Sequence, residues 1–366
     1  MVEWKKLDTL LDFEQPTPYL VKSTEYDDTY ETPVLTAGQS LLLGYTNETD
    51  GIYKASKDNP TIIFDDFTTS FHWIDYNFKV KSSAMKMLRP KKGVNFRYVY
   101  YSMCGINFVP GGHQRHWISK YSQFEIPMPS LSEQNRIVGI LDTFTSSIEN
   151  LKQQIAERRK QYEYYRDQLL DLEGKDGVKM KSLGEICDTL SGFPFDSTHF
   201  SETGIRLMRG MNVKRGFLDF SEENNKYWES SIGLEKFLLE ANDIIVSMDG
   251  SLVGRSFCYL KKEHLPLMLV QRVARIRTNE NYKYVYYNLT MRFPDYVDKK
   301  KTAGAIPHIS MKDINSFVIP VPSHEEQSRI VSILDTFEAS ISNLEAQLSQ
   351  REKQYEYYRN KLLTFE

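Results

Sequence analysis

Two arginines and an asparagine surround a glycine in one short stretch of this sequence. Arg206, Arg209 and Asn212 lie within IRLMRGMNV, where Gly210 separates the last two. Arginine can form two hydrogen bonds to the edge of guanine, and asparagine can do the same with adenine. The stretch therefore predicts a loop that contacts bases of double-stranded DNA, with ordinary surface charge as the alternative.

Further basic residues follow in the same part of the chain. Arg255 comes directly after GSLVG, and Lys299, Lys300 and Lys301 form an uninterrupted run. Lysine and arginine neutralise phosphates and supply affinity that does not depend on sequence. We expect phosphate contacts at these positions, and solvated surface charge is the alternative.

A second group of polar residues lies nearer the N-terminus. The loop GGHQRH is expected to contact DNA through His113, Gln114 and Arg115. Weaker candidates follow the acidic pair Asp65–Asp66, and they are Thr68, Thr69 and His72. His113 and His116 have no further ligand residue nearby in the sequence, so we expect no metal site.

Sequence motifs for catalysis are missing. There is no GxxxxGK[ST] phosphate loop, and no glycine-rich cofactor turn precedes an adenine-methylating tetrad of the N/D-P-P-Y/F type. Pro294-Asp295 followed by Asp298-Lys-Lys300 is similar to a nuclease signature, but its spacing is too tight and basic surface fits it better. We expect no catalytic residues, no bound cofactor and no enzyme activity of the chain alone.

Composition further narrows the classes of protein to which the chain can belong. The chain has 366 residues, enough for two or three domains, and a net charge of −3. Residues 178–319 carry 20 basic and 17 acidic side chains, so any DNA affinity must come from local patches or from partners. Three scattered cysteines fit a reducing cytoplasm, and no apolar run approaches the length of a membrane span. The charged start MVEWKK is not expected to act as a signal peptide.

One stretch occurs twice and organises the whole chain. The 44 residues from Pro127 and the 44 from Pro320 align without a gap at an offset of 193, and 28 positions are identical. Each copy is expected to be a helix of about 40 residues, roughly 60 Å long at 1.5 Å per residue. A capping box, Ser130 with Glu133 and Ser323 with Glu326, is expected to begin each helix.

Apolar side chains recur in both copies at alternating steps of four and three, the heptad spacing of a coiled coil. In the first copy the seam comprises Ile137, Leu141, Phe144, Ile148, Leu151, Ile155, Tyr162, Tyr165 and Leu169. In the second copy it comprises Ile330, Leu334, Phe337, Ile341, Leu344, Leu348, Tyr355, Tyr358 and Leu362. Arg158 and Arg351 interrupt the seam once each, and they either fix its register or extend their charge to water.

The connectivity predicts that the two helices pair antiparallel. Residues 178–319 join the end of the first helix to the start of the second, and a domain of that size has a radius of gyration of about 15 Å. Such a domain bridges adjacent helix ends more easily than ends roughly 60 Å apart. Packing of each helix on its own neighbouring domain is the alternative. Off the seam, Val138 and Ile140 are repeated as Val331 and Ile333, and they are expected either to dock the same partner twice or to pack on the chain's own domains.

The domains flanking the helices are expected to be mixed α/β. We define lobe one as residues 1–126 and lobe two as residues 178–319; helix segments 127–172 and 320–366 follow them, with a linker at 173–177. Strands are expected within Val34–Tyr45, Thr61–Phe64 and His72–Val80, and a helix over Asn95–Met103. The segments toward the ends of the two lobes match in sequence, as in FRYVYYSM and YKYVYYNL, while the segments between them differ. The fold class is therefore α+β, with an internal pseudo-two-fold repeat.

Together these segments resemble the specificity subunits of type I restriction-modification systems. In lobe two the resemblance rests on Gly192–Ser197, Leu207–Asn212, Asp243–Arg255, Gln271–Ile276 and Gly304–Ser310, and after it on Ile319–Ser323 with Glu326-Gln327. In lobe one it rests on Ala37–Gly44, Asp65-Asp66 and Lys81–Met85. Each motif is weak, but their order around duplicated helices is specific.

The resemblance implies two target-recognition domains, each reading one half of a bipartite, asymmetric DNA site. It implies that the coiled coil sets the spacer and docks two methyltransferase subunits, and that restriction/translocase subunits join them in a bacterial or archaeal cytoplasm. S-adenosylmethionine, ATP and Mg are expected on those partners. Two alternatives remain: a self-contained methyltransferase or nuclease, which the missing motifs oppose, and a coiled-coil scaffold without base readout, which the diverged lobes oppose.

Overall fold

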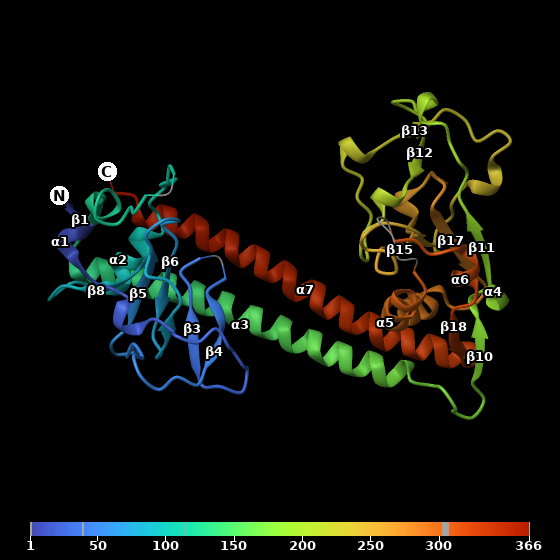
Figure 1. Cartoon of the computed structure of the whole chain (residues 1–366). Coiled ribbons are helices and arrows are strands. Elements are labelled where there is room, and N and C mark those ends of the chain that lie inside the picture. The colour runs from blue at the N-terminus through green and yellow to red at the C-terminus, as the bar shows by residue number, and fades with distance from the viewer. Residues whose placement is uncertain (1, 39, 113, 302–306, 366) are drawn as a thin grey trace. The chain divides into compact units, whose positions relative to one another are not determined.

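The fold is known from a computed structural model, which describes residues 2–38, 40–112, 114–301 and 307–365. The chain forms two compact units. Unit 1 comprises residues 1–153 and 345–366, and unit 2 comprises residues 154–344. Each unit therefore contains one lobe together with parts of both long helices (Figure 1).

Lobe one contains three small sheets. A four-stranded antiparallel sheet has the order β2-β8-β5-β6 and a three-stranded sheet the order β4-β3-β7, while β1 pairs with β9. The strands are β1 Glu3–Lys6, β2 Leu11–Glu14, β3 Thr32–Leu35, β4 Leu42–Thr46, β5 Thr61–Asp65, β6 Phe71–Ile74, β7 Lys79–Val80, β8 Met85–Pro90 and β9 Glu125–Met128. The helices are α1 Leu7–Leu10 and α2 Phe96–Met103.

Lobe two repeats this arrangement. Its four-stranded sheet has the order β11-β17-β14-β15, its three-stranded sheet the order β13-β12-β16, and β10 pairs with β18. The strands are β10 Lys179–Ser182, β11 Cys187–Ser191, β12 Ile205–Met208, β13 Tyr227–Trp228, β14 Ile244–Ser247, β15 Phe257–Tyr259, β16 Leu267–Leu269, β17 Val273–Thr278 and β18 Val318–Val321. The helices are α4 Leu183–Ile186, α5 Tyr282–Lys300 and α6 Met311–Asn315.

The predicted elements of lobe one are largely confirmed, with two corrections. β5 is a buried strand, and α2 begins at the Asn95 cap, whose side chain accepts a hydrogen bond from Tyr98 N. Val34–Tyr45 is a hairpin of β3 and β4, and it turns because Thr36 N and Thr36 Oγ1 bond back to the carbonyls of Leu41 and Ser40. His72–Val80 contributes to two strands that belong to different sheets, β6 and β7.

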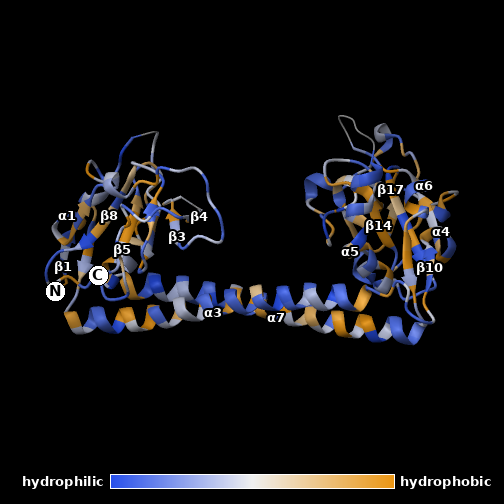
Figure 2. Ribbon diagram, turned by 60° about the horizontal axis from the view of Figure 1, so that its bottom comes forward, coloured by the Kyte–Doolittle hydropathy of each residue, from blue (hydrophilic) through white to orange (hydrophobic). Residues whose placement is uncertain are grey.

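One of the two inner strands of each four-stranded sheet lies in the core of its lobe. Ile62, Ile63 and Phe64 of β5 are buried completely, as are Ile244, Ile245 and Val246 of β14. Figure 2 shows both strands coloured as hydrophobic, with polar residues gathered on the loops. Burial of apolar area on both faces of these short strands stabilises each lobe.

Two 40-residue helices, α3 Leu131–Leu170 and α7 His324–Leu363, agree with the predicted length. The serine half of each capping box is present, since Glu133 N donates to Ser130 Oγ and Glu326 N to Ser323 Oγ. The predicted contact of each glutamate with the backbone N–H of its serine is wrong, because the carboxylates of Glu133 and Glu326 pair instead with Arg136 and Arg329, one turn further on.

The helices pack antiparallel within each unit. In unit 1 the first half of α3 contacts the last residues of α7, where Ile137 and Leu141 cluster with Tyr355 and Leu362. In unit 2 the end of α3 contacts the start of α7, where Tyr162 and Leu169 pack against Ile330 and Leu334. The predicted pairing direction is therefore confirmed.

Most predicted seam positions face the partner helix. Ile137, Leu141, Ile330 and Leu334 are fully buried beside the lobes. Ile148, Leu151, Ile341, Leu344 and Leu348 are half-buried, and Tyr165 and Tyr358 keep 46% and 41% exposure at the edge of the contact. Off the seam, Val138 packs on the Tyr98–Tyr101 cluster of lobe one and Val331 lies in the core of lobe two. These two valines therefore serve their own lobes, and Ile140 and Ile333 remain half-exposed.

Matching hydrogen bonds fasten each lobe to its helix. In unit 1 the Tyr101 hydroxyl donates to Asp142 Oδ1 at 2.5 Å, and in unit 2 the Tyr287 hydroxyl donates to Asp335 Oδ1 at 2.6 Å. Asp142 and Asp335 are equivalent at the repeat offset, and each also binds a basic residue of the preceding lobe helix, Arg97 of α2 or Lys283 of α5. The duplication therefore extends from sequence to individual contacts.

Candidate nucleic-acid interface

A groove of about 690 Å³ crosses the surface of lobe two. Three segments line most of it: the turn after β12, the loop after β14 and the turn before β17. Its polar or charged lining residues include Ser197, Arg209, Lys214, Ser251, Gln271 and Arg272. Positive side chains with hydroxyls and an amide are the groups that bind phosphates and base edges. This groove is the candidate surface for nucleic acid in lobe two.

Of the three predicted contact residues Arg206, Arg209 and Asn212, only Arg209 lines the groove. Its guanidinium lies 5.8 Å from the ring centroid of Phe200, another lining residue. Gly210 lies close to the neighbouring segment, since a Cβ there would come within 3.2 Å of Ser247 Oγ. The loop therefore runs close to the end of β14 and leaves Arg209 at the groove.

Asn212 has a different position from the expected one. Its side chain is fully buried, donates hydrogen bonds to the carbonyls of Asp219 and Asn224, and accepts one from Arg209 N. Both of its amide hydrogens are used within the chain, and its oxygen already accepts one hydrogen bond from the backbone. The expectation of a direct base contact by Asn212 is therefore wrong for this structure, in which Asn212 holds the turn that carries Arg209.

Arg206 also lies outside the groove lining. Its guanidinium stacks on Phe220, with Cζ 4.5 Å from the ring centroid, and it lies 5.9 Å from the Tyr227 ring. Arginine on an aromatic face is a favourable packing contact. Arg206 thus stabilises the β12–β13 face, and a role in DNA contact stays a prediction.

The predicted phosphate-contact residues form one cluster at the end of α5. Arg255 makes two hydrogen bonds to the Asp298 carboxylate, at 3.1 and 2.6 Å, and Lys301 binds the same group at 2.8 Å. These donors hold the pKa of Asp298 well below its usual range. Lys299 and Lys300 are exposed. Because Asp298 is taken up by these two cations, the nuclease-like spacing at Asp295–Lys300 forms a surface ion-pair cluster.

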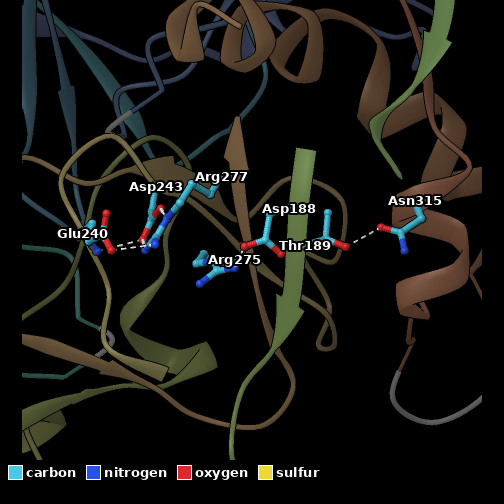
Figure 3. Close-up of polar contacts among 7 residues, drawn as sticks. All are labelled: Asp188, Thr189, Glu240, Asp243, Arg275, Arg277 and Asn315. Atoms are coloured by element: carbon cyan, nitrogen blue, oxygen red, sulfur yellow. Dashed lines mark hydrogen bonds and ion pairs between the residues drawn. The ribbon is translucent and has the colours of Figure 1, made fainter. Parts of the chain in front are cut away.

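Other arginines of lobe two are bound by acidic side chains within the fold (Figure 3). Arg275 of β17 is buried and pairs with Asp188 of β11. Arg277 bonds to Asp243 at 2.6 Å and to Glu240 at 2.6 Å. These pairs neutralise charge that would otherwise lie uncompensated in or beside the sheet. They support the sheet that carries the groove.

In lobe one the structure brings two of the predicted segments together. Asp66, at the end of β5, accepts hydrogen bonds from His116 N through its carbonyl and from Trp117 N through Oδ1. The Asp65–Ser70 turn therefore lies against the segment that carries Gln114 and Arg115, which are exposed. His113 lies outside the described residues. His116, which is not expected to bind a metal, is buried completely beside Phe108.

Several of the remaining candidate residues of lobe one already make contacts within the lobe. Thr68 Oγ1 bonds to Ser70 Oγ at 2.9 Å, and Thr69 is mostly buried with a φ of 58°. His72 Nε2 lies 3.0 Å from the Gly38 carbonyl. Asp66 itself is buried with Lys86, 3.0 Å away, as its ion-pair partner. DNA contact by Thr68, Thr69, His72, Gln114 and Arg115 stays a prediction.

Sequence reasoning missed Arg272, Gln271 and Lys214 as groove residues. Arg272 keeps 67% of its side chain exposed at the rim, where it pairs with Asp249 at 3.0 Å. A signal was present, since Gln271-Arg272 opens one of the segments on which the family resemblance rests. Within the described ranges, no helix could span a bilayer and no three acidic, histidine or cysteine side chains form a candidate metal site.

Comparison with known proteins gives one consistent answer. The sequence matches the family described as type I restriction modification DNA specificity domain over residues 1–158 and again over 175–352. It is 41% identical to the EcoR124I/EcoR124II type I restriction enzyme specificity subunit of Escherichia coli, over all of this chain and 94% of that protein. It is 25% identical to a putative type I specificity subunit of Haemophilus influenzae, S.HindORF215P, over all of this chain and 96% of that one.

Solved structures share the fold. The S subunit of a type I restriction-modification system from M. genitalium has a TM-score of 0.67 at 18% identity, covering 100% of this chain and 97% of that chain. A chain of a second solved structure, described as one of the type I R-M system, has a TM-score of 0.57 at 16% identity, covering 99% of this chain and 96% of that chain. Specificity subunits are the non-catalytic parts of type I restriction-modification complexes. The family match over both halves of the sequence and the 41% identity to the Escherichia coli subunit show that the chain belongs to the specificity subunits of type I restriction-modification systems.

Proposed function

We propose that each lobe reads one half of a bipartite, asymmetric DNA site. One observation carries this proposal: the two lobes attach to their helices through the same contacts, whereas their surface loops differ. Tyr101–Asp142 and Tyr287–Asp335 attach the two lobes to their helices in the same way. The loops differ, since the groove turns of lobe two have no close sequence counterpart in lobe one. Two similar modules with different surfaces would recognise different base sequences.

The paired helices would set the distance between the two half-sites. Two readers on one support can contact the same face of a duplex only at separations fixed by its helical repeat, about 34–36 Å per turn. Base pairs between the half-sites would then remain unread. The reciprocal seam contacts support a fixed helix register, since the equivalent aromatic pairs Phe144–Tyr358 and Phe337–Tyr165 stack at 5.3 and 5.4 Å.

The same helices would dock two methyltransferase subunits. Tyr164 and Tyr357 are equivalent at the repeat offset, and they are 62% and 59% exposed. Exposed aromatic residues are enriched at protein interfaces, and a duplicated pair fits two copies of one partner. Those partners would hold S-adenosylmethionine and, with restriction/translocase subunits, ATP and Mg. The specificity chain would thereby direct adenine methylation or cleavage to its site.

A selection experiment tests the proposal. The chain, co-purified with its methyltransferase partner, is incubated with randomised duplexes, and bound duplexes are sequenced. The proposal predicts enrichment of two short, different words separated by a gap of fixed length. Enrichment of one continuous word would contradict the two-lobe reading, and no enrichment would favour a scaffold without base readout. In a parallel pull-down, Tyr164→Ala with Tyr357→Ala should weaken capture of the methyltransferase.

A further inference from the structure

Arg272 differs from the other arginines of the sheet in lobe two. All three pair with carboxylates, Arg272 with Asp249 and the two arginines of the strand that follows, Arg275 and Arg277, with the partners drawn in Figure 3, so the difference is in exposure. The exposed fractions of Arg275 and Arg277 are 6% and 31%, whereas that of Arg272 is 67%. Arg272 therefore presents its guanidinium to solvent at the groove, while its neighbours stabilise the sheet.

The backbone holds Arg272 in a conformation that arginine rarely adopts. Val273 N donates to the Val270 carbonyl, which closes a four-residue turn with Arg272 in third position. Arg272 has a φ of 63°, and type II turns usually place glycine at that position for this reason. Met248 N donates to the Arg272 carbonyl and fixes the turn against the end of β14. Strained backbone kept at a surface site is a reason to look for function there.

Asp249 restrains the side chain from the opposite segment. Its Oδ2 accepts a hydrogen bond from Arg272 Nη1 at 3.0 Å. Asp249 is only 20% exposed, and its Oδ1 lies 3.8 Å from the position that a Cβ on Gly210 would occupy. Arg272 and Arg209 are thereby brought to one groove from two segments. Among the described contacts of Arg272, this ion pair is the one that binds its guanidinium, so N–H groups remain for a ligand.

We propose that Arg272 reads a guanine in the half-site of lobe two, with Asp249 as its positioning residue. This proposal rests on the proposed function of the lobe. A guanidinium offers parallel N–H groups that match O6 and N7 of guanine in the major groove. Restraint by a carboxylate and a fixed turn lowers the cost of ordering the side chain for such a contact. A phosphate contact would need only charge, which exposed lysines such as Lys299 and Lys300 provide without a restrained side chain.

The test compares wild type, Arg272→Gln and Arg272→Lys in the randomised-duplex selection, each with the methyltransferase partner. Wild type should enrich two words, one of which contains a guanine that Arg272→Gln no longer selects. The preference at that position should fall about 5- to 150-fold. The other word should stay unchanged, which also reports that the complex remains assembled. Arg272→Lys keeps the charge without the planar fork, and it should retain affinity with a weaker guanine preference.

Arg215→Gln is the matched control, because Arg215 is exposed in the same lobe and lies outside the groove lining. It removes the same charge and should leave both words intact. If Arg272→Gln weakens all duplexes equally and keeps both words, Arg272 contacts phosphate and the proposal is overturned. An unchanged guanine preference in Arg272→Lys also overturns it. Failure of wild type to enrich two words contradicts the proposed function instead.

Asp249→Asn tests the positioning role. Asparagine keeps the size of the side chain but loses the charge that holds the guanidinium. The same guanine position should relax, by less than in Arg272→Gln. The double variant Arg272→Gln with Asp249→Asn should be no less specific than Arg272→Gln alone, because residues acting through one contact are not additive. Independent losses at different positions would show that Asp249 acts separately.

Discussion

The guanidinium of Arg158 lies over the ring of Phe337, with Cζ 5.8 Å from the ring centroid. Arg351 and Phe144, their equivalents at the offset of 193, form the same contact at 5.7 Å. The same contact is thus made once in each unit, by equivalent residues of the two repeats. The seam arginines therefore meet a specific aromatic residue of the partner helix, which agrees with the register role and accounts for their place in an apolar seam.

Replacing Arg158 by alanine should destabilise unit 2. The cation–π contact and the packing of the arginine stem are lost together, at a cost of about 0.5–1 kcal/mol in the free energy of unfolding. Urea denaturation of the full chain measures this loss. Lys160→Ala, at an exposed position of the same helix, should change stability less. Equal stability of the two variants would show that Arg158 contributes nothing through Phe337.

Removing the hydroxyl of Tyr287 should loosen lobe two from its helix. Burial raises the pKa of this tyrosine far above its usual range, and the neighbouring Asp335 adds to the effect, so the hydroxyl stays a donor. Tyr287→Phe leaves Asp335 without one hydrogen bond in a partly buried site, which costs about 1–3 kcal/mol. Hydrogen exchange should show faster opening in unit 2, and Tyr101→Phe should produce the same change in unit 1. Tyr357→Phe, at an exposed hydroxyl, is the control.

Glu338 should make unit 2 less stable as the pH rises. Burial, and then the charge of Asp335, raise the pKa of Glu338 above its ordinary value of 4.5. Between the unfolded and folded pKa values the folded state binds more protons, so the free energy of unfolding falls with increasing pH. Glu338→Gln keeps an acceptor for the Tyr162 hydroxyl, 3.4 Å away, and removes the charge.

Denaturation of Glu338→Gln and wild type across this pH range measures the effect. The variant should be more stable than wild type at neutral pH, and the difference should shrink on acidification. The equivalent position of α3 is Thr145, which has no carboxylate. The first repeat therefore serves as the comparison that lacks the titrating group. A variant that is less stable at neutral pH would show that the Glu338 charge is compensated in the fold.

Lys299 should contribute to affinity without contributing to specificity. It is exposed beside the Arg255–Asp298–Lys301 cluster. Loss of one phosphate contact reduces the slope of log affinity against log salt by about 0.9. Lys299→Gln should therefore weaken binding to selected and scrambled duplexes alike in a salt titration. A change in the selected sequence would contradict a phosphate role.

Much of the architecture could be predicted because it is encoded locally and twice. The heptad spacing in Ile137–Leu169 specifies a helix, and its repetition at a constant offset specifies a partner for it. The chain length between the copies then decides the direction of pairing. Val138 and Val331 show the limit of this reasoning, because the lobe helices that cover them lie far away in sequence.

The groove of lobe two could be predicted only in part. Arg209 was recognisable from residue type and the adjacent glycine. Asn212 was placed wrongly because its partners, the carbonyls of Asp219 and Asn224, are brought to it by tertiary structure. Arg272 carries no local sign of its positive φ, since sequence propensity favours glycine at that turn position. Side chains whose roles depend on distant carbonyls and on strained turns are beyond pattern reasoning.

The central claim is that two different lobes read two halves of one DNA site. Sequencing host DNA by a method that detects methylated adenine, with this gene present and with it deleted, tests the claim most directly. We predict that deletion removes one bipartite motif, with two different half-sites and an unread spacer of constant length. Loss of a continuous motif, or of two identical half-sites, would contradict it.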